Sequence, residues 1–360
     1  MKILGIESSC DETAAAVVED GVRVLSNVVQ SQVDIHAEYG GVVPEVAARS
    51  HIEVINPVIR AALKQANCTW DDIDAIAVAY APGLIGSLLV GVLAARTLAI
   101  LQQKPLYAVH HVEAHVYANF IIDQSGATSY TLPSLTPRFP MLALAVSGLH
   151  SQLILFNDHG NYQLLGQTYD DAVGEAFDKV ARILGLPYPG GPAIAAAAMN
   201  GDPAAYPLPK AKLKSKYDFS FSGLKTAVLR AVQREVGVDH TFPSRELAVR
   251  LNDVQRANFA ASFQYTAVKT LVDAAEAAYN EHHPQTVVIA GGVAANQELR
   301  RQLTERLPIQ IEYAPIQLCT DNGAMVAALG YYYAQVQPPA DPYNVDVVPS
   351  LSMTQTAWAA

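Results

Sequence analysis

The sequence predicts an α/β protein built from two related halves, and three observations lead to this fold class. The order strand, polar loop, strand, turn, strand occurs in "KILGIESSCDETAAAVVEDGVRVLSNVV" from Lys2 and again in "LALAVSGLHSQLILFNDHGNYQLLGQT" from Leu142. Short apolar strands alternate with helical patterns after each of these segments. The chain has 360 residues, of which 51% are hydrophobic, which suits a globular protein of two domains or of one large domain. Chance similarity between two ordinary meanders is the alternative.

The first half contains one set of strands with its covering helices. The dipeptide Asp20-Gly21 is typical of a tight hairpin turn. The longest helical pattern carries Ile52, Ile55 and Ile59 on one face. Strands are predicted at 2–6, 13–18, 22–29, 73–79 and 106–109, and helices at 44–66 and 84–101. The second of these helices is mostly apolar, and glycines within it favour a buried helix over a membrane span.

The second half repeats this order and adds helices. Strands are predicted at 142–146, 152–156, 162–168, 286–290 and 309–314, and helices at 171–184, 223–235, 245–281, 296–306 and 321–334. The segment 123–139 is rich in Ser, Thr and Pro and is interpreted as a connection between the halves. We therefore expect an N-terminal lobe at 1–122, a C-terminal lobe at 140–335 with a helical insertion, and a loosely ordered tail at 336–360.

The bulk composition narrows the classes of protein. The net charge of −10 argues against a protein that coats nucleic acid by bulk electrostatics. Three scattered cysteines do not make a disulfide framework, which predicts a reducing cytoplasm. A carboxylate at Glu7 comes too early for a signal peptide. These features favour a cytoplasmic protein that does not enter a membrane.

Three of the ten histidines lie in "VHHVEAHVYANF", around Glu113. On a helix, His111 and His115 are four residues apart and share a face, a spacing with which two imidazoles chelate one divalent metal. Zinc proteases of the His-Glu-x-x-His type place Glu directly after the first His. Glu113 is instead two residues on, about 200° around the helix, and points away from such a metal. A polar helix surface is the alternative interpretation.

Two acid-bearing loops favour the metal site. The loop "ESSCDET" follows the first strand, at a strand end where α/β proteins place ligands. Asp11 and Glu12 in that loop can orient a metal-bound phosphate or act as a general base. The loop "CTDNGAM" places Asp321 at a predicted helix N-cap. A solvated hairpin and a simple capping role are the alternatives.

Glycine-bearing loops can present backbone N–H groups to a phosphate or an adenine. Three such loops are Ser147-Gly148, Gly190-Gly191 and Gly291-Gly292. None matches a Walker P-loop or a Gly-x-Gly-x-x-Gly fingerprint, which argues against ordinary P-loop and dinucleotide enzymes.

The duplicated halves with their glycine loops resemble the superfamily of actin, Hsp70-like chaperone ATPases and sugar kinases. This is the ASKHA, ribonuclease H-like fold, and it implies two lobes with a nucleotide cleft between them. Seven stretches narrow the match over roughly residues 1–335: "GIESSCDETAAAVV", "HAEYGGVVPEVAARSH", "HHVEAH", "DDAVGEAFDKVARILGLPYPGGP", "FSFSGLKTAV", "VIAGGVAANQELR" and "CTDNGAMVA". In this order they are similar to the bacterial tRNA adenosine threonylcarbamoyltransferases, once called O-sialoglycoprotein endopeptidases.

The resemblance implies an acyl transfer. A threonylcarbamoyl group moves from threonylcarbamoyl-AMP to the N6 amine of the adenosine adjacent to the anticodon, in tRNAs reading codons that begin with A. By the same resemblance His111, His115 and Asp321 hold one divalent metal, Fe²⁺ or Zn²⁺, with the imidazoles from the first lobe and the carboxylate from the second. Asp11 and Glu12 are the candidates for orienting or deprotonating the amine.

The resemblance also places the adenine nucleotide of the substrate. The matching contacts are Ala145, Val146, Ser147, Gly148, Leu149, Asp178, Gly191 and Asn296. The family loop reads Val-Ser-Gly-Gly-His-Thr, whereas this chain has Leu149 at the second glycine position. If that position requires a positive φ, Leu149 would be strained there.

The resemblance implies partners besides tRNA, namely a smaller paralogous subunit and a P-loop ATPase. A local run of lysines in "PKAKLKSKYDF" could contact phosphates, or form an ordinary solvated loop. An ATP-binding kinase or ATPase of the same fold is the main alternative function, and a metalloprotease a weaker one because of the placement of Glu113.

Overall fold

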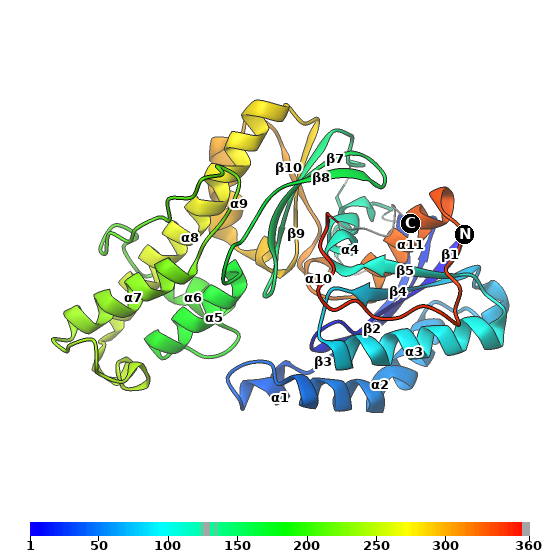
Figure 1. Ribbon diagram of the computed structural model, residues 1–360, viewed down its shortest axis with the longest axis horizontal. Coiled ribbons are helices and arrows are strands. Elements are labelled where there is room, and N and C mark those ends of the chain that lie inside the picture. Colours follow the sequence, from blue (N-terminus) through cyan, green and yellow to red (C-terminus); the bar gives the residue numbers. More distant parts are fainter. Residues whose placement is uncertain (124, 126–129, 134, 355–360) are drawn as a thin grey trace. The chain divides into compact units, whose positions relative to one another are not determined.

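The computed structural model describes residues 1–123, 125, 130–133 and 135–354, and the chain forms two compact units (Figure 1). The first unit comprises Met1–Arg138, Phe156–Tyr162 and Glu312–Ala360, and the second comprises Phe139–Leu155 and Gln163–Ile311. The expected lobes divided the chain differently, since they kept 312–335 with the C-terminal half. This segment instead packs with the first unit because helix α11 (Gly323–Val336) lies against strand β1.

Two five-stranded sheets repeat one strand order, which confirms the duplicated α/β fold. The first sheet has the order β3-β2-β1-β4-β5, and the second has the corresponding order β8-β7-β6-β9-β10. The strands of the first are β1 (Lys2–Glu7), β2 (Glu12–Glu19), β3 (Arg23–Ser31), β4 (Ala75–Ala81) and β5 (Leu106–His110). Those of the second are β6 (Met141–Val146), β7 (Ser151–Asp158), β8 (Asn161–Gln167), β9 (Thr286–Ala290) and β10 (Ile311–Tyr313).

The turn between β2 and β3 has the predicted chemistry. Asp20 and Gly21 both have positive φ, of 52° and 70°, and the N–H of Val22 donates to the carbonyl of Glu19. Two consecutive positive φ values match the right-handed twist of paired strands, and Asp-Gly tolerates them. The antiparallel β1–β2–β3 ribbon and the parallel pairing of β4 with β1 therefore follow local sequence signals.

Alternate residues of β1 face different helices. Leu4 and Ile6 belong to the core beneath α2 (Pro44–Gln65) and α3 (Ile85–Gln102), which Figure 1 shows running alongside each other. Gly5 faces α11, and a Cβ at this position would lie 2.3 Å from the carbonyl oxygen of Gly323. Only a glycine allows this close approach. It places the N-terminal end of α11 near the carboxyl end of β1.

Helix α3 is partly exposed rather than fully buried. By length and composition it is the one helix in the described residues that could cross a membrane, with a hydropathy of 1.8. Leu88, Val92 and Ala95 are buried, whereas Ile85 and Leu101 are exposed. The expectation of a buried helix therefore holds for one side of α3, which packs on α2 and β4.

The other helices follow the predicted order with three additions, two of which are only four or five residues long. In the first unit these are α1 (Val33–Ala37), α4 (His111–Tyr117), and α10 (Ile316–Cys319). In the second they are α5 (Val173–Leu184), α6 (Gly190–Ala198), α7 (Ser222–Glu235), α8 (Asp253–His282) and α9 (Gln297–Arg306). Short 3₁₀ turns lie at Trp70–Asp72, Ala118–Phe120, Ser244–Glu246, Ala248–Arg250 and Gly292–Ala295. Helix α6 was not predicted, because its Ala-rich sequence has no amphipathic pattern.

The C-terminal segment corrects the prediction of a loosely ordered tail, as far as it is described. Residues 338–351, called the strap here, lie on the first unit. Ala340 bridges Leu106, and the Arg96 guanidinium donates to the carbonyls of Pro342, Tyr343 and Val345. Residues 355–360 of the predicted tail lie outside the described part.

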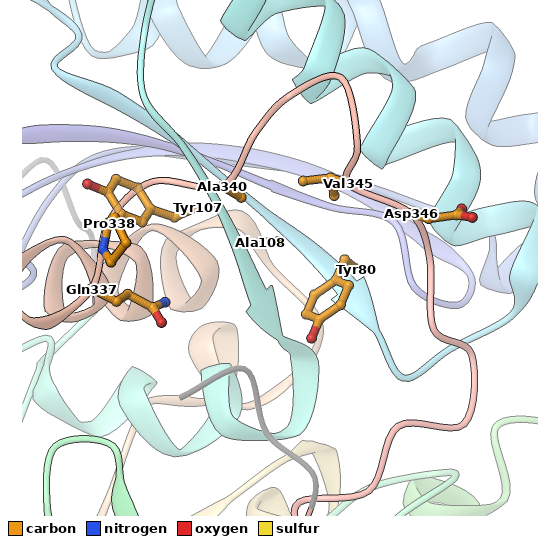
Figure 2. A pocket seen from close by; sticks show the side chains of 8 residues that line it. All are labelled: Tyr80, Tyr107, Ala108, Gln337, Pro338, Ala340, Val345 and Asp346. Carbon is orange, nitrogen blue, oxygen red and sulfur yellow. The ribbon is translucent and has the colours of Figure 1, made fainter. Parts of the chain in front are cut away.

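The strap covers a pocket of about 290 Å³ beside β4 and β5. Figure 2 shows Tyr80 and Ala108 from the strands, Gln337 after α11, and Val345 and Asp346 from the strap among its lining residues. The strap ends at the candidate site, where the carbonyl of Leu351 lies 3.2 Å from His110 Nε2. Specific hydrogen bonds thus hold this segment on the first unit, and its Pro-rich composition does not predict them.

Candidate metal centre and nucleotide loops

Strand β5 runs directly into helix α4, and this junction presents the two predicted histidines. His110 ends the strand and its side chain caps α4 by accepting from the N–H of Glu113. His111 and His115 then lie one turn apart, with ring centroids 4.7 Å apart and planes at 79°. Their exposed fractions are 5% and 3%. The alternative of a polar helix surface is therefore wrong.

Asp321 completes a group of three ligand atoms. Its Oδ1 lies 3.0 Å from His115 Nε2 and 3.6 Å from His111 Nε2, and the three atoms lie within 4.8 Å of one another. The predicted N-cap role belongs instead to Asn322, whose side chain accepts from the N–H of Met325. Asp321 thus precedes the cap and faces the histidines.

All three residues belong to the first unit. The expectation that the carboxylate comes from a second lobe is therefore wrong, and its physical reason is the packing of α11 on β1 described above. The group is built inside one compact unit, from the β5–α4 junction and the residues that precede α11.

Glu7 is the residue that sequence reasoning missed. Ile3, Gly5 and Glu7 alternate along β1 toward the α11 side, and Glu7 is fully buried. Its Oε2 lies 2.9 Å from His111 Nδ1, and Ser9 Oγ lies 3.1 Å from the same nitrogen. A carboxylate on the far nitrogen of an imidazole is the usual support of a metal-ligating histidine. The sequence signal for this role was a carboxylate at the last position of an apolar strand, where a charged side chain needs a partner.

Two carboxylates make this position favourable for positive charge. Burial lowers the pKa of His111, but the charges of Glu7 and then Asp321 outweigh it and raise this pKa to about 9. A cation is therefore favoured between these groups, whether a proton on the imidazole or a metal ion in its place.

The residues fit a divalent metal. Both ring nitrogens of His115 are buried without a hydrogen-bond partner in the described part of the chain, although Nε2 lies 3.0 Å from Asp321 Oδ1. Such a short contact without hydrogen-bond geometry suits two ligands of one ion. Two imidazoles and one carboxylate leave further coordination positions open, as catalytic iron and zinc sites require.

Asp11 ends the β1–β2 loop and Glu12 begins β2, beside this group. Burial, followed by the charges of Asp321 and Asp11, raises the pKa of Glu12 to about 10. Its Oε1 accepts from Ser31 Oγ at 3.1 Å. In the metal-free chain Glu12 is therefore protonated at neutral pH.

His51 on α2 is a second residue that sequence reasoning did not single out. Its Nε2 lies 3.0 Å from the carbonyl of Cys10, and its Nδ1 lies 2.7 Å from Thr13 Oγ1. Burial lowers the pKa of His51, so the ring is neutral. His51 therefore contacts the chain on both sides of Asp11 and holds this loop in place. The motif "HAEYGGVVPEVAARSH" ends at His51, but a sequence pattern does not indicate that this histidine contacts Cys10 and Thr13, far earlier in the chain.

The predicted nucleotide residues lie in the second unit, on three loops that pack together. The carbonyls of Ser147 and Gly148 accept from the first turn of α5, whose Asp178 accepts from the N–H of Gly190 at 2.7 Å. Gly291 has φ +84°, and a Cβ there would lie 2.4 Å from the carbonyl oxygen of Val146. Ala145 and Val146 end strand β6, directly before the first of these loops, and Gly191 lies in the first turn of α6. A Cβ added at Gly148 or Gly191 would meet open space.

Two of these residues differ from the expectation in detail. Leu149 is not among the non-glycine residues with positive φ in the described part, so the predicted strain is absent. Its side chain is 51% exposed. Asn296 is the N-cap of α9, where it accepts from Leu299 N–H and donates to Gln264 Oε1. Its amide is therefore committed to the loop's structure in this state.

Comparison with known proteins finds one family along most of the chain. The family model "TsaD: tRNA N6-adenosine threonylcarbamoyltransferase" matches residues 23–328. A tRNA N6-adenosine threonylcarbamoyltransferase of Symbiobacterium thermophilum is 51% identical over 354 residues, which cover 98% of this chain and 96% of that protein. One of Thermomicrobium roseum is 51% identical over 346 residues, 93% of this chain and 92% of that protein.

Among solved structures, full-length HypF in its phosphate- and nucleotide-bound form aligns with 93% of this chain and 46% of its own, with a TM-score of 0.55 and 13% identity. At this identity the likeness concerns the fold alone.

Proposed function

The chain belongs to the tRNA N6-adenosine threonylcarbamoyltransferase family, and we propose that its transfer centre is the group of His111, His115 and Asp321. The chain is accordingly a transferase that modifies adenosine in tRNA, and the kinase and protease alternatives are not favoured. The single observation that supports the centre is the contact of His115 Nε2 with Asp321 Oδ1, 3.0 Å apart and otherwise without hydrogen-bond geometry.

The proposed reaction joins threonylcarbamoyl-AMP to the adenosine adjacent to the anticodon, in tRNAs reading codons that begin with A. The N6 nitrogen of adenosine forms a bond to the carbamoyl carbon, and the bond from that carbon to the phosphate oxygen breaks. AMP leaves with the electron pair, and the amine loses one proton. Asp11 is the proposed acceptor of this proton, and Glu12 orients the amine.

Histidine and carboxylate ligands of this kind suit Fe²⁺ or Zn²⁺, and we propose that one such ion binds here. When bound, such an ion supplies Lewis-acid polarisation of the carbamoyl carbonyl or neutralisation of the phosphate. Glu7 holds His111 by its Nδ1 side, so that Nε2 is directed at Asp321. Burial of both imidazoles excludes water from this edge of the site.

The nucleotide loops of the second unit are the proposed site for the AMP portion. Residues 145–149 are the proposed contact for the phosphate. The N–H of Ser147 donates to the carbonyl of His150 within this turn, so Gly148 and Leu149 are the residues proposed to present backbone N–H groups. The Asp178 carboxylate of α5 contacts the N-terminal end of α6, which carries Gly191. Open space around Gly148 and Gly191 supports a close approach of ligand to backbone. Asn296 caps α9 and donates to Gln264, and we propose that it supports the nucleotide site by holding the loop that precedes α9.

The proposed partners are tRNA, a smaller paralogous subunit and a P-loop ATPase, in the cytoplasm. The negative net charge means that tRNA needs a local basic surface or a partner. In the lysine run, Lys210 and Lys216 pair with Asp273 and Glu281, which leaves less positive charge than the sequence suggests.

A protease of the His-Glu-x-x-His type requires that the glutamate of the histidine-bearing helix face the metal. Glu113 instead accepts hydrogen bonds from Tyr333 and Tyr162, as its helical position predicts. It therefore has no access to a water molecule on an ion between His111 and Asp321. The same group of ligands also has no evident task in a simple kinase.

The test compares His111→Ala with His240→Ala, an exposed histidine of the second unit. Each variant is incubated with tRNA, threonine, bicarbonate, ATP and the partner enzymes, and tRNA nucleosides are analysed by mass. We expect His111→Ala to lose bound metal and threonylcarbamoyladenosine, while His240→Ala retains both. Undiminished transfer by His111→Ala would rule out the proposed centre.

A further inference from the structure

Glu113 is a buried carboxylate that the proposed reaction does not use. It lies on α4 between the two metal-ligand histidines, is fully buried, and faces away from them. Its Oε2 accepts a hydrogen bond from Tyr333 at 3.0 Å and a longer one from Tyr162 at 3.5 Å. A buried carboxylate costs free energy unless it is hydrogen-bonded, which makes its retention here informative.

Tyr333 belongs to α11, the helix that follows Asp321. At about 1.5 Å per residue it lies about 15 Å from the start of α11 at Gly323. Burial and then the charge of Glu113 raise the pKa of Tyr333 well above its usual range, so its hydroxyl keeps the proton that it donates. Tyr333 is itself fully buried.

Helix α4 packs against α11 through several contacts, one of which is Tyr117 on Tyr332 with ring centroids 5.1 Å apart. Two polar contacts, about 200° apart around α4, add to this packing. At one point His115 and His111 face Asp321, before the first turn of α11. At the other point Glu113 meets Tyr333, near the end of α11. Side-chain packing alone allows small rotations of α4 against α11, and a directional hydrogen bond on the side away from the ligands limits them. A rotation would change the distances between the ligand atoms.

We propose that Glu113 and Tyr333 are positioning residues of the metal centre. Their buried hydrogen bond fixes α4 against α11 and holds His111, His115 and Asp321 at ligand spacing before a metal binds. The inference rests on the proposed centre. It gives Glu113 a role that differs from that of the general base in a metalloprotease, because the carboxylate acts through the helix and touches no reactant.

The test measures Co²⁺ affinity of the metal-free full chain by chelator competition, together with the visible absorption spectrum of the bound ion. Tyr333→Phe and Glu113→Ala should each weaken binding by about tenfold, at the lower end for residues that support metal ligands. The double variant should bind no more weakly than Glu113→Ala, because both changes remove one shared interaction. Glu113→Gln keeps an oxygen that accepts the hydrogen bond from Tyr333, so this variant should retain most of the wild-type affinity for Co²⁺.

The matched control is Tyr332→Phe, which removes a hydroxyl at the neighbouring position, where the ring stacks on His159. It should leave the affinity and the spectrum unchanged. Wild-type affinity and spectrum in Tyr333→Phe would overturn the positioning role alone, even if Glu113→Ala fails to fold. A wild-type chain that binds no Co²⁺ or Zn²⁺ would overturn the metal centre, and the positioning role with it.

Discussion

The carboxylate of Glu7 lies 2.9 Å from Nδ1 of His111 and directs the other ring nitrogen toward Asp321. This contact joins the end of the first strand to the start of α4. It places a negative charge behind the ligand, which increases the basicity of the imidazole. The proposed metal centre therefore includes a residue that is not a ligand.

Glu7→Gln should weaken metal binding. The amide keeps the shape of the side chain but removes the charge that supports His111, so we expect a loss of about 10- to 100-fold in affinity. Zinc affinity measured by chelator competition checks this, with Glu53→Gln on the exposed side of α2 as the control. Equal zinc affinities for the two variants would contradict the proposed role of Glu7 in supporting His111 as a ligand.

The metal-free protein should lose stability as the pH rises toward 9. The pKa of His111 is raised from 6.5 to about 9 in the folded state. Its stabilising contribution is therefore complete below pH 6.5 and is lost as the pH rises through 9. The pKa of Glu12, raised from 4.5 to about 10, adds a loss of the same sign from about pH 4.5 to 10, and therefore across the same range. Free energies of unfolding from urea titrations between pH 6.5 and 9 measure the effect.

In that titration His111→Gln is the control, and its slope between pH 6.5 and 9 should be smaller than that of the wild type. Metal binding shows the opposite trend, since the ion replaces the proton on His111 and binds more tightly as the pH rises. An equal slope for the wild type and for His111→Gln would exclude the assigned protonation.

Asp11→Asn should reduce transfer without removing the metal. If Asp11 accepts the proton of the amine, its loss lowers kcat by about 10²- to 10⁴-fold. Glu12→Gln resembles the protonated form that its raised pKa favours, and should have a much smaller effect. Single-turnover transfer measured with metal content checks both variants. A larger loss in Glu12→Gln than in Asp11→Asn would reverse the assignment.

Arg96→Ala should release the strap. The guanidinium donates to three carbonyls at 2.6 to 3.0 Å, and each hydrogen bond contributes about 0.5–1.5 kcal/mol. We expect faster hydrogen exchange at 340–351 and a lower free energy of unfolding. Arg60→Ala, at an exposed position of α2, is the control. Unchanged exchange in Arg96→Ala would mean that other contacts hold the strap.

Local signals predicted local structure well. The Asp20-Gly21 turn, the strands and the spacing of His111 and His115 depend on a few neighbouring residues, and the structure reproduces them. The duplicated strand order follows from the same alternation of strands and helices.

Features set by tertiary contacts were harder to predict. Assignment of Asp321 to a lobe depends on the packing of α11 on β1, which a linear division of the chain cannot represent. The N-cap was placed one residue early because Asp321 and Asn322 are both good caps. Glu7 and the strap depend on partners far along the chain.

The central claim is that one ion is bound by His111, His115 and Asp321. Anomalous diffraction from crystals of the metal-loaded chain, collected at the iron and zinc absorption edges, tests it most directly. We predict one peak within bonding distance of both Nε2 atoms and of Asp321 Oδ1. A peak bound elsewhere, or a fully loaded chain in which Asp321 does not contact the ion, would contradict the account.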